Sequence, residues 1–363
     1  MNTPYIDTQN ALDPWLQRWS RAPFLALDTE FVREQTYYAQ LCLVQIGDGE
    51  HSVCIDPLAG LDLQPLWACI HDAQHPRVFH AAGQDLEILV QLTGRAPSSL
   101  FDTQIAAGLL GMGDQIGYAA LIEKQLGIRL DKSLSRTNWA RRPLNERETT
   151  YATDDVRHLA VIYPDLRDAL QRRGRLHWLQ EDCATMADPK RYRVDPEREW
   201  RRLKGLVRLP RKAQHVAARL AAWRDVVGEQ RNRPRRWILP DEALYALAER
   251  QPQTLAQLGT LQALPPKTIE RHGRALIEMI EEAGRCDAPP LIEEVRLSDI
   301  EKQRIRRVQD ALRVTAERLE ISVSLLAPRA DIEALALLGA DADIPLLRGW
   351  RREAVGAALL EML

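Results

Sequence analysis

The chain has 363 residues, of which 45% are hydrophobic and 28% charged, and its formal net charge is −2; this composition is typical of a soluble globular protein of two or three domains. No run of about 18 apolar residues is present, which excludes a transmembrane helix, and the N-terminal segment lacks the basic start and apolar core of a signal peptide. The five cysteines form no CxxC motif, which argues against zinc fingers and disulfide frameworks, so we expect a cytoplasmic protein.

The first half of the chain contains three strand-like stretches. Residues 24–31 (FLALDTEF) form a strand pattern that is apolar on both faces, as in a sheet buried on both sides. Residues 41–57 (LCLVQIGDGEHSVCIDP) predict two strands around an Asp-Gly turn. Residues 77–81 (RVFHA) predict another short strand.

Helical segments lie between and after these strands. Residues 84–92 and 117–126 have helical spacing, and a long helix begins near Glu146. Pro164 predicts a kink or a break in this long helix. Strands interspersed with helices indicate an α/β domain with one central mixed sheet and flanking helices, which we place at residues 1–190.

The second half predicts helices only. Residues 188–199 (DPKRYRVDPERE) are charged and contain two prolines, which marks a domain edge. Two short sequences then recur in the same order, with offsets of 88 and 83 residues: LPDEALYALA (239–248) with APRADIEALA (327–336), and ALIEMI (275–280) with ALLEML (358–363). We therefore expect two related small helical domains, at residues 191–287 and 288–363.

Two acids share one face of the first strand. Asp28 and Glu30 alternate with Thr29, so both point to the same side of a strand with apolar surroundings. Two carboxylates a few Å apart in such a setting repel each other and lose hydration. A divalent cation such as Mg²⁺ or Mn²⁺ would remove the repulsion, because these ions prefer oxygen ligands.

A third acid follows the strand at 77–81. Asp85 lies in the first turn of the next helix, where the helix dipole favours an acid, so a purely local helix-terminus role is one interpretation. On the helix it shares a face with Ile88 and Leu89 and points toward the sheet, whereas Glu87 points to water. Asp85 is therefore a candidate metal ligand.

A fourth acid lies on the long helix. Tyr151 and Asp155 are spaced i, i+4 and continue into an apolar stripe, so Asp155 faces inward, which is costly without a cation. Asp154 is rotated by about 100° and belongs to a polar face. Asp102 fits none of these positions, and we expect it to be structural.

The motifs DTE (28–30), GQDLE (83–87) and YATDD (151–155) together resemble the DEDDy family of 3′→5′ exonucleases, whose fold is ribonuclease H-like. The helical half resembles two HRDC domains, which are nucleic-acid-binding modules. An exonuclease domain followed by two HRDC-like domains resembles the layout of the bacterial ribonuclease D family. The flanking residues 28–49 and 130–144 also resemble that family.

The resemblance implies two bound Mg²⁺ or Mn²⁺ ions, held by Asp28, Glu30, Asp85 and Asp155. The residue types agree, because all four are hard oxygen ligands and the chain offers no His/Cys set that suits zinc. Tyr151 is then the residue that orients the attacking water; with an ordinary pKa near 10 it is neutral and unsuited to be the base. Core packing with a satisfied hydroxyl is the alternative for Tyr151.

Substrate contacts are less specific in the sequence. His80 and Gln84 precede Asp85 and are candidates to touch the terminal nucleotide, or are structural polar groups. The loop 131–143 is basic, bears hydroxyl groups and contains an aromatic residue, a combination that suits phosphate contact and base stacking. Its candidates are Lys132, Ser133, Arg136 and Trp139. A solvated loop with a packed Trp is the alternative.

The net charge hides a basic stretch. Between Glu197 and Leu239 there are thirteen Lys or Arg against four Asp or Glu. Its densest part contains Arg233, Arg235 and Arg236, which we expect to neutralise phosphates in a salt-sensitive way. A solvated helix face, or pairing with acids of another domain, is the alternative interpretation.

These observations lead to one main hypothesis and two rivals. The main one is a metal-dependent 3′→5′ exoribonuclease that releases 5′-mononucleotides from structured RNA such as tRNA precursors and acts as a monomer away from membranes. The closest rival is a DNA 3′→5′ exonuclease, since contacts to a 2′-hydroxyl leave no signature in the sequence. The other is an inactive nucleic-acid-binding protein, against which the complete set of inward acids argues.

Overall fold

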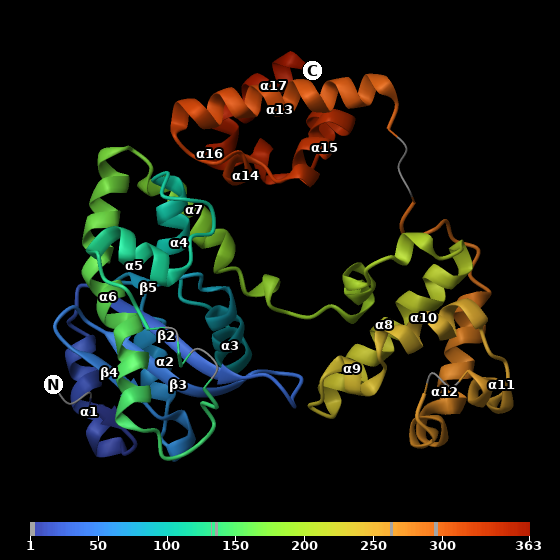
Figure 1. Cartoon of the computed structure of the whole chain (residues 1–363), viewed down its shortest axis with the longest axis horizontal. Coiled ribbons are helices and arrows are strands. Elements are labelled where there is room, and N and C mark those ends of the chain that lie inside the picture. Colours follow the sequence, from blue (N-terminus) through green and yellow to red (C-terminus); the bar gives the residue numbers. More distant parts are fainter. Residues whose placement is uncertain (1–3, 132, 135–136, 262–263, 294–296) are drawn as a thin grey trace. The chain divides into compact units, whose positions relative to one another are not determined.

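The computed structural model of the chain (Figure 1) describes residues 4–131, 133–134, 137–261, 264–293 and 297–363. The chain forms two compact units. The first consists of Met1–Val32, Leu41–Tyr192 and Leu297–Leu363, and the second of Arg33–Gln40 and Arg193–Arg296.

A six-stranded sheet forms the centre of the first unit, in the order β1-β4-β3-β2-β5-β6. The strands are β1 (Tyr5–Ile6), β2 (Leu25–Val32), β3 (Gln40–Gly47), β4 (Ser52–Ile55), β5 (Arg77–Phe79) and β6 (Leu100–Asp102). Strands β3 and β4 pair antiparallel, whereas β5 pairs parallel with both β2 and β6. The expected hairpin and the mixed sheet are therefore confirmed, and β2 lies inside the sheet.

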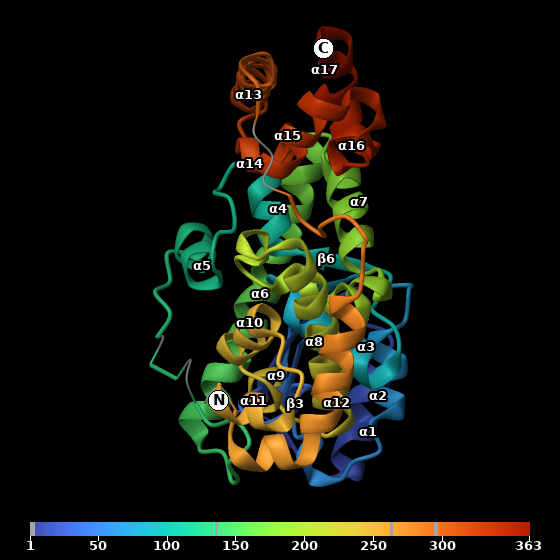
Figure 2. The ribbon, with the colours of Figure 1, turned by 90° about the vertical axis from the view of Figure 1, so that its right-hand side faces the viewer.

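Seven helices accompany the sheet in the described part of residues 1–192. They are α1 (Gln9–Trp19), α2 (Gln64–Ile70), α3 (Gly83–Thr93), α4 (Thr103–Leu109), α5 (Tyr118–Leu126), α6 (Glu146–Arg172) and α7 (Leu176–Met186). Figure 2 shows α6 on one side of the strands and α1, α2 and α3 on the other. Both faces of the sheet are thus covered, which explains why β2 reads as apolar on both faces.

Helix α6 crosses the sheet closely. It packs against β2, β4 and β5, and a Cβ atom on Gly47 of β3 would lie 3.0 Å from the carbonyl oxygen of Val156. A capping box of Asn145 and Glu148 begins the helix. The helix continues through Pro164 to Arg172, so of the kink or break expected at this proline the structure excludes the break.

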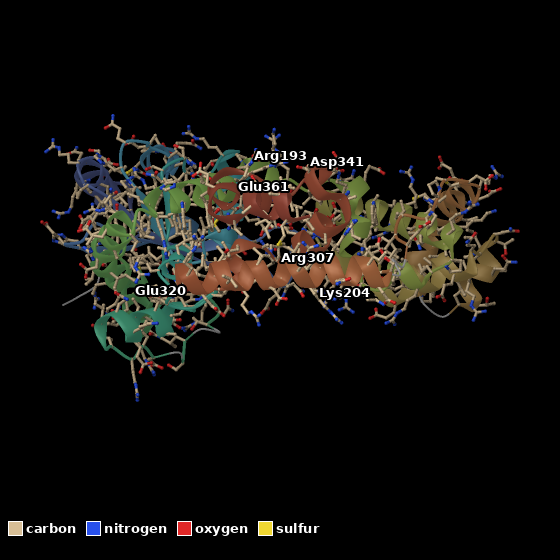
Figure 3. The ribbon with its side chains drawn as sticks, turned by 90° about the horizontal axis from the view of Figure 1, so that it is seen from above. Arg193, Lys204, Arg307, Glu320, Asp341 and Glu361 are labelled. Carbon is tan, nitrogen blue, oxygen red and sulfur yellow. The ribbon has the colours of Figure 1, made fainter. Side chains whose placement is uncertain are left out.

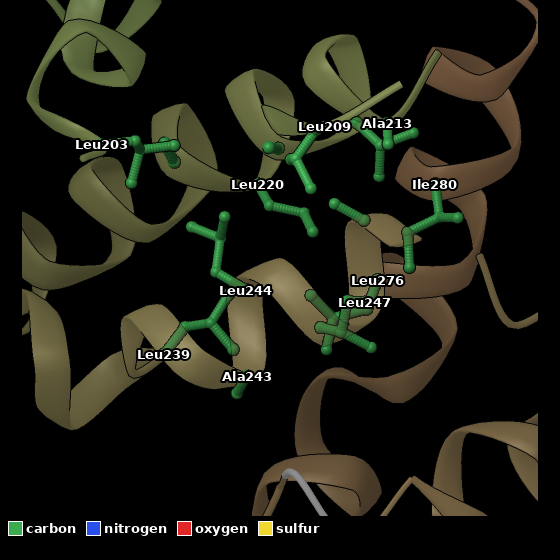
Figure 4. Close-up of a cluster of buried hydrophobic side chains, with 14 of the residues drawn as sticks. Leu203, Leu209, Ala213, Leu220, Leu239, Ala243, Leu244, Leu247, Leu276 and Ile280 are labelled. Atoms are coloured by element: carbon green, nitrogen blue, oxygen red, sulfur yellow. The ribbon is translucent and has the colours of Figure 1, made fainter. Parts of the chain in front are cut away.

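The second unit contains five α-helices in its described residues: α8 (Arg211–Gln230), α9 (Arg235–Ile238), α10 (Asp241–Arg250), α11 (Leu255–Thr260) and α12 (Pro266–Gly284). Their apolar faces meet in one core (Figure 4), in which Leu220, Leu244 and Leu276 are fully buried. Burial of these leucines is the main contribution to the stability of the small domain.

The C-terminal helices belong to the first unit: α13 (Asp299–Leu319), α14 (Val323–Leu326), α15 (Arg329–Leu338), α16 (Gly349–Arg351) and α17 (Ala357–Met362). A four-residue helix followed by a ten-residue helix occurs both in α9–α10 and in α14–α15, as the sequence repeat predicts. Arg307 of α13, labelled in Figure 3, donates to the carbonyl oxygen of Met362 at 2.9 Å, which ties α17 to α13. Among the described residues, no helix combines the length and apolar character that a membrane span requires.

Candidate active site

Two elements bring three carboxylates together. Asp28 and Glu30 lie on one face of β2, and Asp155 lies on α6, which packs against that strand. Each offers one carboxylate oxygen, and these oxygens all lie within 4.8 Å of one another. Three hard oxygen donors at this spacing form a suitable site for a divalent cation.

Asp85 is the fourth acid near this cluster. It is buried in the first turn of α3 and accepts a hydrogen bond from the Thr29 hydroxyl. Thr29 alternates with Asp28 and Glu30 on β2, and its hydrogen bond couples the strand to α3. The charge of Asp85 also raises the pKa of Asp28.

Burial and mutual repulsion dominate the electrostatics of the cluster. Burial, with the charges of Asp85, Asp155 and Glu30, raises the pKa of Asp28 well above its ordinary value. Burial also raises the pKa of Glu30 to about 8, that of Asp155 to about 7 and that of Asp85 to about 6. A bound cation would favour the ionised forms and remove this cost. The four acids thus fit a metal by donor type, spacing and charge.

Tyr151 lies one turn before Asp155 on α6. Burial, and then the charges of Asp155, Glu30 and Asp28, raise its pKa, so the phenol is neutral. Its ring stacks on the Trp139 indole, with centroids 6.2 Å apart and planes 29° apart. Trp139 is only 3% exposed and packs with Cys42 and Cys54, so in this structure it has no open face for base stacking.

Two cavities meet at these residues. One, of about 510 Å³, is lined by Asp28, His80, Tyr118, Tyr151 and Asp155, among others. The other, of about 440 Å³, shares Tyr151 and Asp155 and is also lined by Asp131 and Arg147. Space of this size beside the acids can hold small ligands such as nucleotides.

Tyr118 of α5 is a wall residue that sequence reasoning missed. Its hydroxyl donates to the backbone carbonyl oxygen of Asp154 at 3.0 Å and also to that of Asp155. Its ring meets the His80 ring edge to face, at 5.5 Å between centroids. From the sequence, residues 117–126 are recognisable only as a helix. The role of Tyr118 leaves no pattern, because its hydroxyl bonds to backbone oxygens and needs no particular partner side chain.

The other residues predicted to touch the substrate differ in their positions relative to the cavities. His80 lines the larger cavity, with its Nδ1 3.0 Å from the Thr103 hydroxyl, whereas Gln84 is exposed in the first turn of α3. The Ser133 hydroxyl donates to Asp131 at 2.7 Å. Lys132 and Arg136 lie outside the described residues.

Asp102 has the structural role expected of it. It begins α4 and accepts hydrogen bonds from four backbone N–H groups, those of Ala81, Ala82, Gln104 and Ile105. These bonds join the end of β5 to the start of α4.

The three arginines of the second unit differ in their surroundings. Arg235 is half-buried and pairs with Asp225 at 2.5 Å and with Glu199 at 3.2 Å, and it donates to the Tyr37 hydroxyl at 2.9 Å. Arg233 is exposed and lies over the exposed Trp237 ring, 5.7 Å from its centroid.

Arg236 is also exposed, with a single ion pair to Glu242 at 3.0 Å. Pairing with acids, the alternative given above, therefore describes Arg235 better than its two neighbours, although the acids belong to the same unit.

Known proteins agree with this arrangement. A family model described as 3′-5′ exonuclease matches residues 4–171, and one described as HRDC domain matches residues 213–280. Ribonuclease D of Sphingobium indicum is 38% identical over 99% of this chain and 94% of that protein; the enzyme of Nitrobacter hamburgensis is 39% identical over 98% and 94%. The chain belongs to the ribonuclease D family.

A solved structure extends the ribonuclease D relationship to the whole fold. Escherichia coli RNase D, described as an exoribonuclease involved in structured RNA processing, matches with a TM-score of 0.88 at 33% identity, over 100% of this chain and 99% of that one. The expected fold class is confirmed, and the chain is a hydrolytic 3′→5′ exoribonuclease; a DNA exonuclease is not favoured. Exonuclease domains of this family use divalent metal ions.

Proposed function

We propose that Asp28, Glu30, Asp85 and Asp155 hold two divalent ions, Mg²⁺ or Mn²⁺, for the hydrolysis of RNA from its 3′ end. The convergence of oxygens from Asp28, Glu30 and Asp155 within 4.8 Å carries this proposal. When bound, such ions activate a water and stabilise the charge of the departing oxygen. The buried walls of β2 and α6 hold the carboxylates in place, so little reorganisation is needed at the moment of reaction.

Tyr151 orients the attacking water in this proposal. Its phenol is neutral because burial and the nearby acids raise its pKa, so it donates a hydrogen bond and does not remove a proton. The stacked Trp139 keeps the Tyr151 ring at its position on α6. We therefore assign to Trp139 a positioning role in place of base stacking.

The two cavities accommodate the end of the RNA. The larger cavity takes the terminal nucleotide, with His80 on its wall and Gln84 near the start of α3. In the smaller cavity, the exposed Arg147 guanidinium, paired with Asp131 at 3.0 Å, offers a phosphate contact one nucleotide further back. Ser133 belongs to the loop beside this cavity, and Lys132 and Arg136, which lie outside the described residues, remain candidates from the sequence alone.

The substrate we propose is a structured RNA with a 3′ extension, such as a tRNA precursor, which is shortened to release 5′-mononucleotides. Arg233 and Arg236 contribute phosphate contacts from the second unit, whereas Arg235 mainly holds its own domain. We propose that the protein acts as a monomer in the cytoplasm; its five unpaired cysteines suit a reducing compartment.

Product analysis tests the activity, its polarity and its metal dependence together. A tRNA precursor with a 3′ extension, labelled at its 5′ end in one sample and uniformly in another, is incubated with Mg²⁺, with Mn²⁺ or with EDTA. We expect a ladder shortened from the 3′ end and free 5′-mononucleotides with either metal, and intact RNA in EDTA. Internal fragments, or equal cleavage in EDTA, contradict the proposal.

A further inference from the structure

The C-terminal helices are joined to the exonuclease domain through α7. The Trp350 indole of α16 lies parallel to that of Trp178, with centroids 4.4 Å apart and planes 11° apart. Asp182 accepts a hydrogen bond from the Trp350 ring nitrogen at 3.1 Å and is paired by two nitrogens of Arg351, at 2.5 Å and 3.0 Å. The Trp350 side chain is 1% exposed, so this is a packed interface and not a loose surface contact.

A second set of contacts joins the same helices to the end of α4. The Arg175 side chain, 9% exposed, donates to the carbonyl oxygen of Leu109 at 2.6 Å and to that of Leu319 at 2.7 Å. One buried guanidinium thus connects the C-terminal ends of α4 and α13. At Gly111, where φ is +77°, a Cβ atom would lie 2.3 Å from the carbonyl oxygen of Glu320, the residue labelled at the end of α13 in Figure 3.

The segment held in this way leads into the active-site wall. Residues 110–117 connect α4 to α5, and the Asp114 carboxylate accepts a hydrogen bond from Ser324 of α14. Three residues further on, Gly117 and Tyr118 line the cavity that contains Asp28 and Asp155. Tyr118 then bonds through its hydroxyl to the backbone of α6 at Asp154 and Asp155.

We propose that the C-terminal helices position the active site through this segment, from α16 and α14 to residues 110–117 and then to Tyr118 and Asp155. The exonuclease domain and the C-terminal helices thus act together in the chemical step, in addition to any part that those helices have in RNA binding. Tyr118 is a positioning residue: it contacts the backbone of α6 at Asp155 and so affects catalysis only through the position of the Asp155 carboxylate. The inference rests on the proposed role of Asp155 as a metal ligand.

A double-mutant cycle in the full chain tests this coupling. The substrate is a single-stranded oligoribonucleotide of a few nucleotides, which reduces the contribution of remote RNA contacts. We expect Tyr118→Phe and Arg351→Ala each to lower kcat by about tenfold with little change in KM, which corresponds to the loss of one or two hydrogen bonds. The double variant should be no slower than the slower single variant, because both changes act on the position of the same group, the backbone that carries Asp155.

Two variants serve as controls. Arg329→Ala removes an ion pair with Glu333 on the outer part of the same helices, where Arg329 is 85% exposed, and should leave kcat unchanged. Ser324→Ala removes the exposed contact to Asp114, together with a hydrogen bond to the neighbouring Ser322 hydroxyl, and keeps the test valid if Arg351→Ala does not fold. It should lower kcat in the same direction as Arg351→Ala.

The outcomes separate this inference from the proposed ligand set. Full cleavage by Asp155→Asn contradicts the role of Asp155 itself. If Asp155→Asn loses cleavage, the ligand role stands and the coupling is tested separately. Additive effects of Tyr118→Phe and Arg351→Ala would then overturn only the proposed coupling. An unchanged kcat in both Arg351→Ala and Ser324→Ala would do the same.

Discussion

At the scale of single residues, the ionised form of the acid cluster is stable only with a compensating charge. Asp28, Glu30 and Asp155 are half-buried and share a small space, and the charges of neighbouring acids raise the cost of ionising Asp28 and Glu30. A protein without a metal function gains nothing from this arrangement, since an apolar residue of similar size would avoid the desolvation cost. The cost of placing these carboxylates together is therefore the strongest support for their proposed role as metal ligands.

Neutral substitutions in the cluster separate catalysis from binding. We expect Asp28→Asn and Asp155→Asn each to lower metal-dependent cleavage by at least about 100-fold, as when a preorganised charge that stabilises a transition state is removed. RNA binding, measured by filter retention, should persist. Asp168→Asn is the matched control, because Asp168 of the same helix pairs with Arg167 at 2.8 Å on an exposed face, so the variant should remain active.

The same acids predict how stability depends on pH without metal. Their pKa values in the folded chain, about 6 for Asp85, about 7 for Asp155 and about 8 for Glu30, exceed those of an unfolded chain, which lie near 4. The folded state therefore binds more protons, and its stability falls as the pH rises from about 4 to about 8. Thermal unfolding in EDTA should show a falling Tm over this range.

Added Mg²⁺ should reverse that loss. At pH 8 the ion binds the ionised acids of the folded chain and raises Tm, whereas at pH 5 protons compete and the rise is small. Asp28→Asn should flatten the pH dependence, because one repelling charge is gone. A Tm that is independent of pH in EDTA contradicts this account of the cluster.

At the scale of elements, the sequence predicts those site residues whose side chains the periodicity of a strand or helix directs inward. The alternation in β2 places Asp28 and Glu30 together, and the helical spacing of α6 aligns Tyr151 with Asp155. Tyr118 could not be predicted, because it bonds to backbone oxygens, which exist at every residue. For Trp139 the sequence leaves base stacking and core packing both open, because the packing of an irregular loop depends on partners distant in sequence, here Cys42 and Cys54.

The loop before α6 supports Tyr151 through Trp139. We expect Trp139→Ala to lower the free energy of unfolding by about 3–5 kcal/mol, the range for truncating a buried aromatic residue, and to lower kcat as well. Urea unfolding and initial rates measure the two effects. Trp237→Ala is the control: Trp237 is 59% exposed, so its loss should leave stability nearly unchanged. Normal stability in Trp139→Ala would contradict its placement in the core.

At the scale of the whole molecule, the two helical segments that share the sequence repeat lie in different compact units. The helices of 211–284 form their own core in a unit that includes the segment Arg33–Gln40. The C-terminal copy lies in the first unit, where Trp350 and Arg351 join it to α7. A repeat visible in sequence therefore predicts two similar folds, but the position of each depends on contacts made by a few residues outside the repeated core.

The excess of basic residues between Glu197 and Leu239 should act in RNA binding through its exposed members only. We expect the double change Arg233→Ala and Arg236→Ala to weaken RNA binding and to reduce the slope of log affinity against log salt by about 1.4, or about 0.7 for each phosphate of a single strand that is no longer neutralised. Arg235→Ala is the matched comparison: its loss leaves the buried Asp225 without its cation, so it should lower the thermal stability of the second unit. Binding titrations at several salt concentrations, with thermal unfolding alongside, distinguish the two effects. An unchanged slope in the double variant would assign the RNA contacts to other residues and leave Arg233 and Arg236 as solvated surface charges.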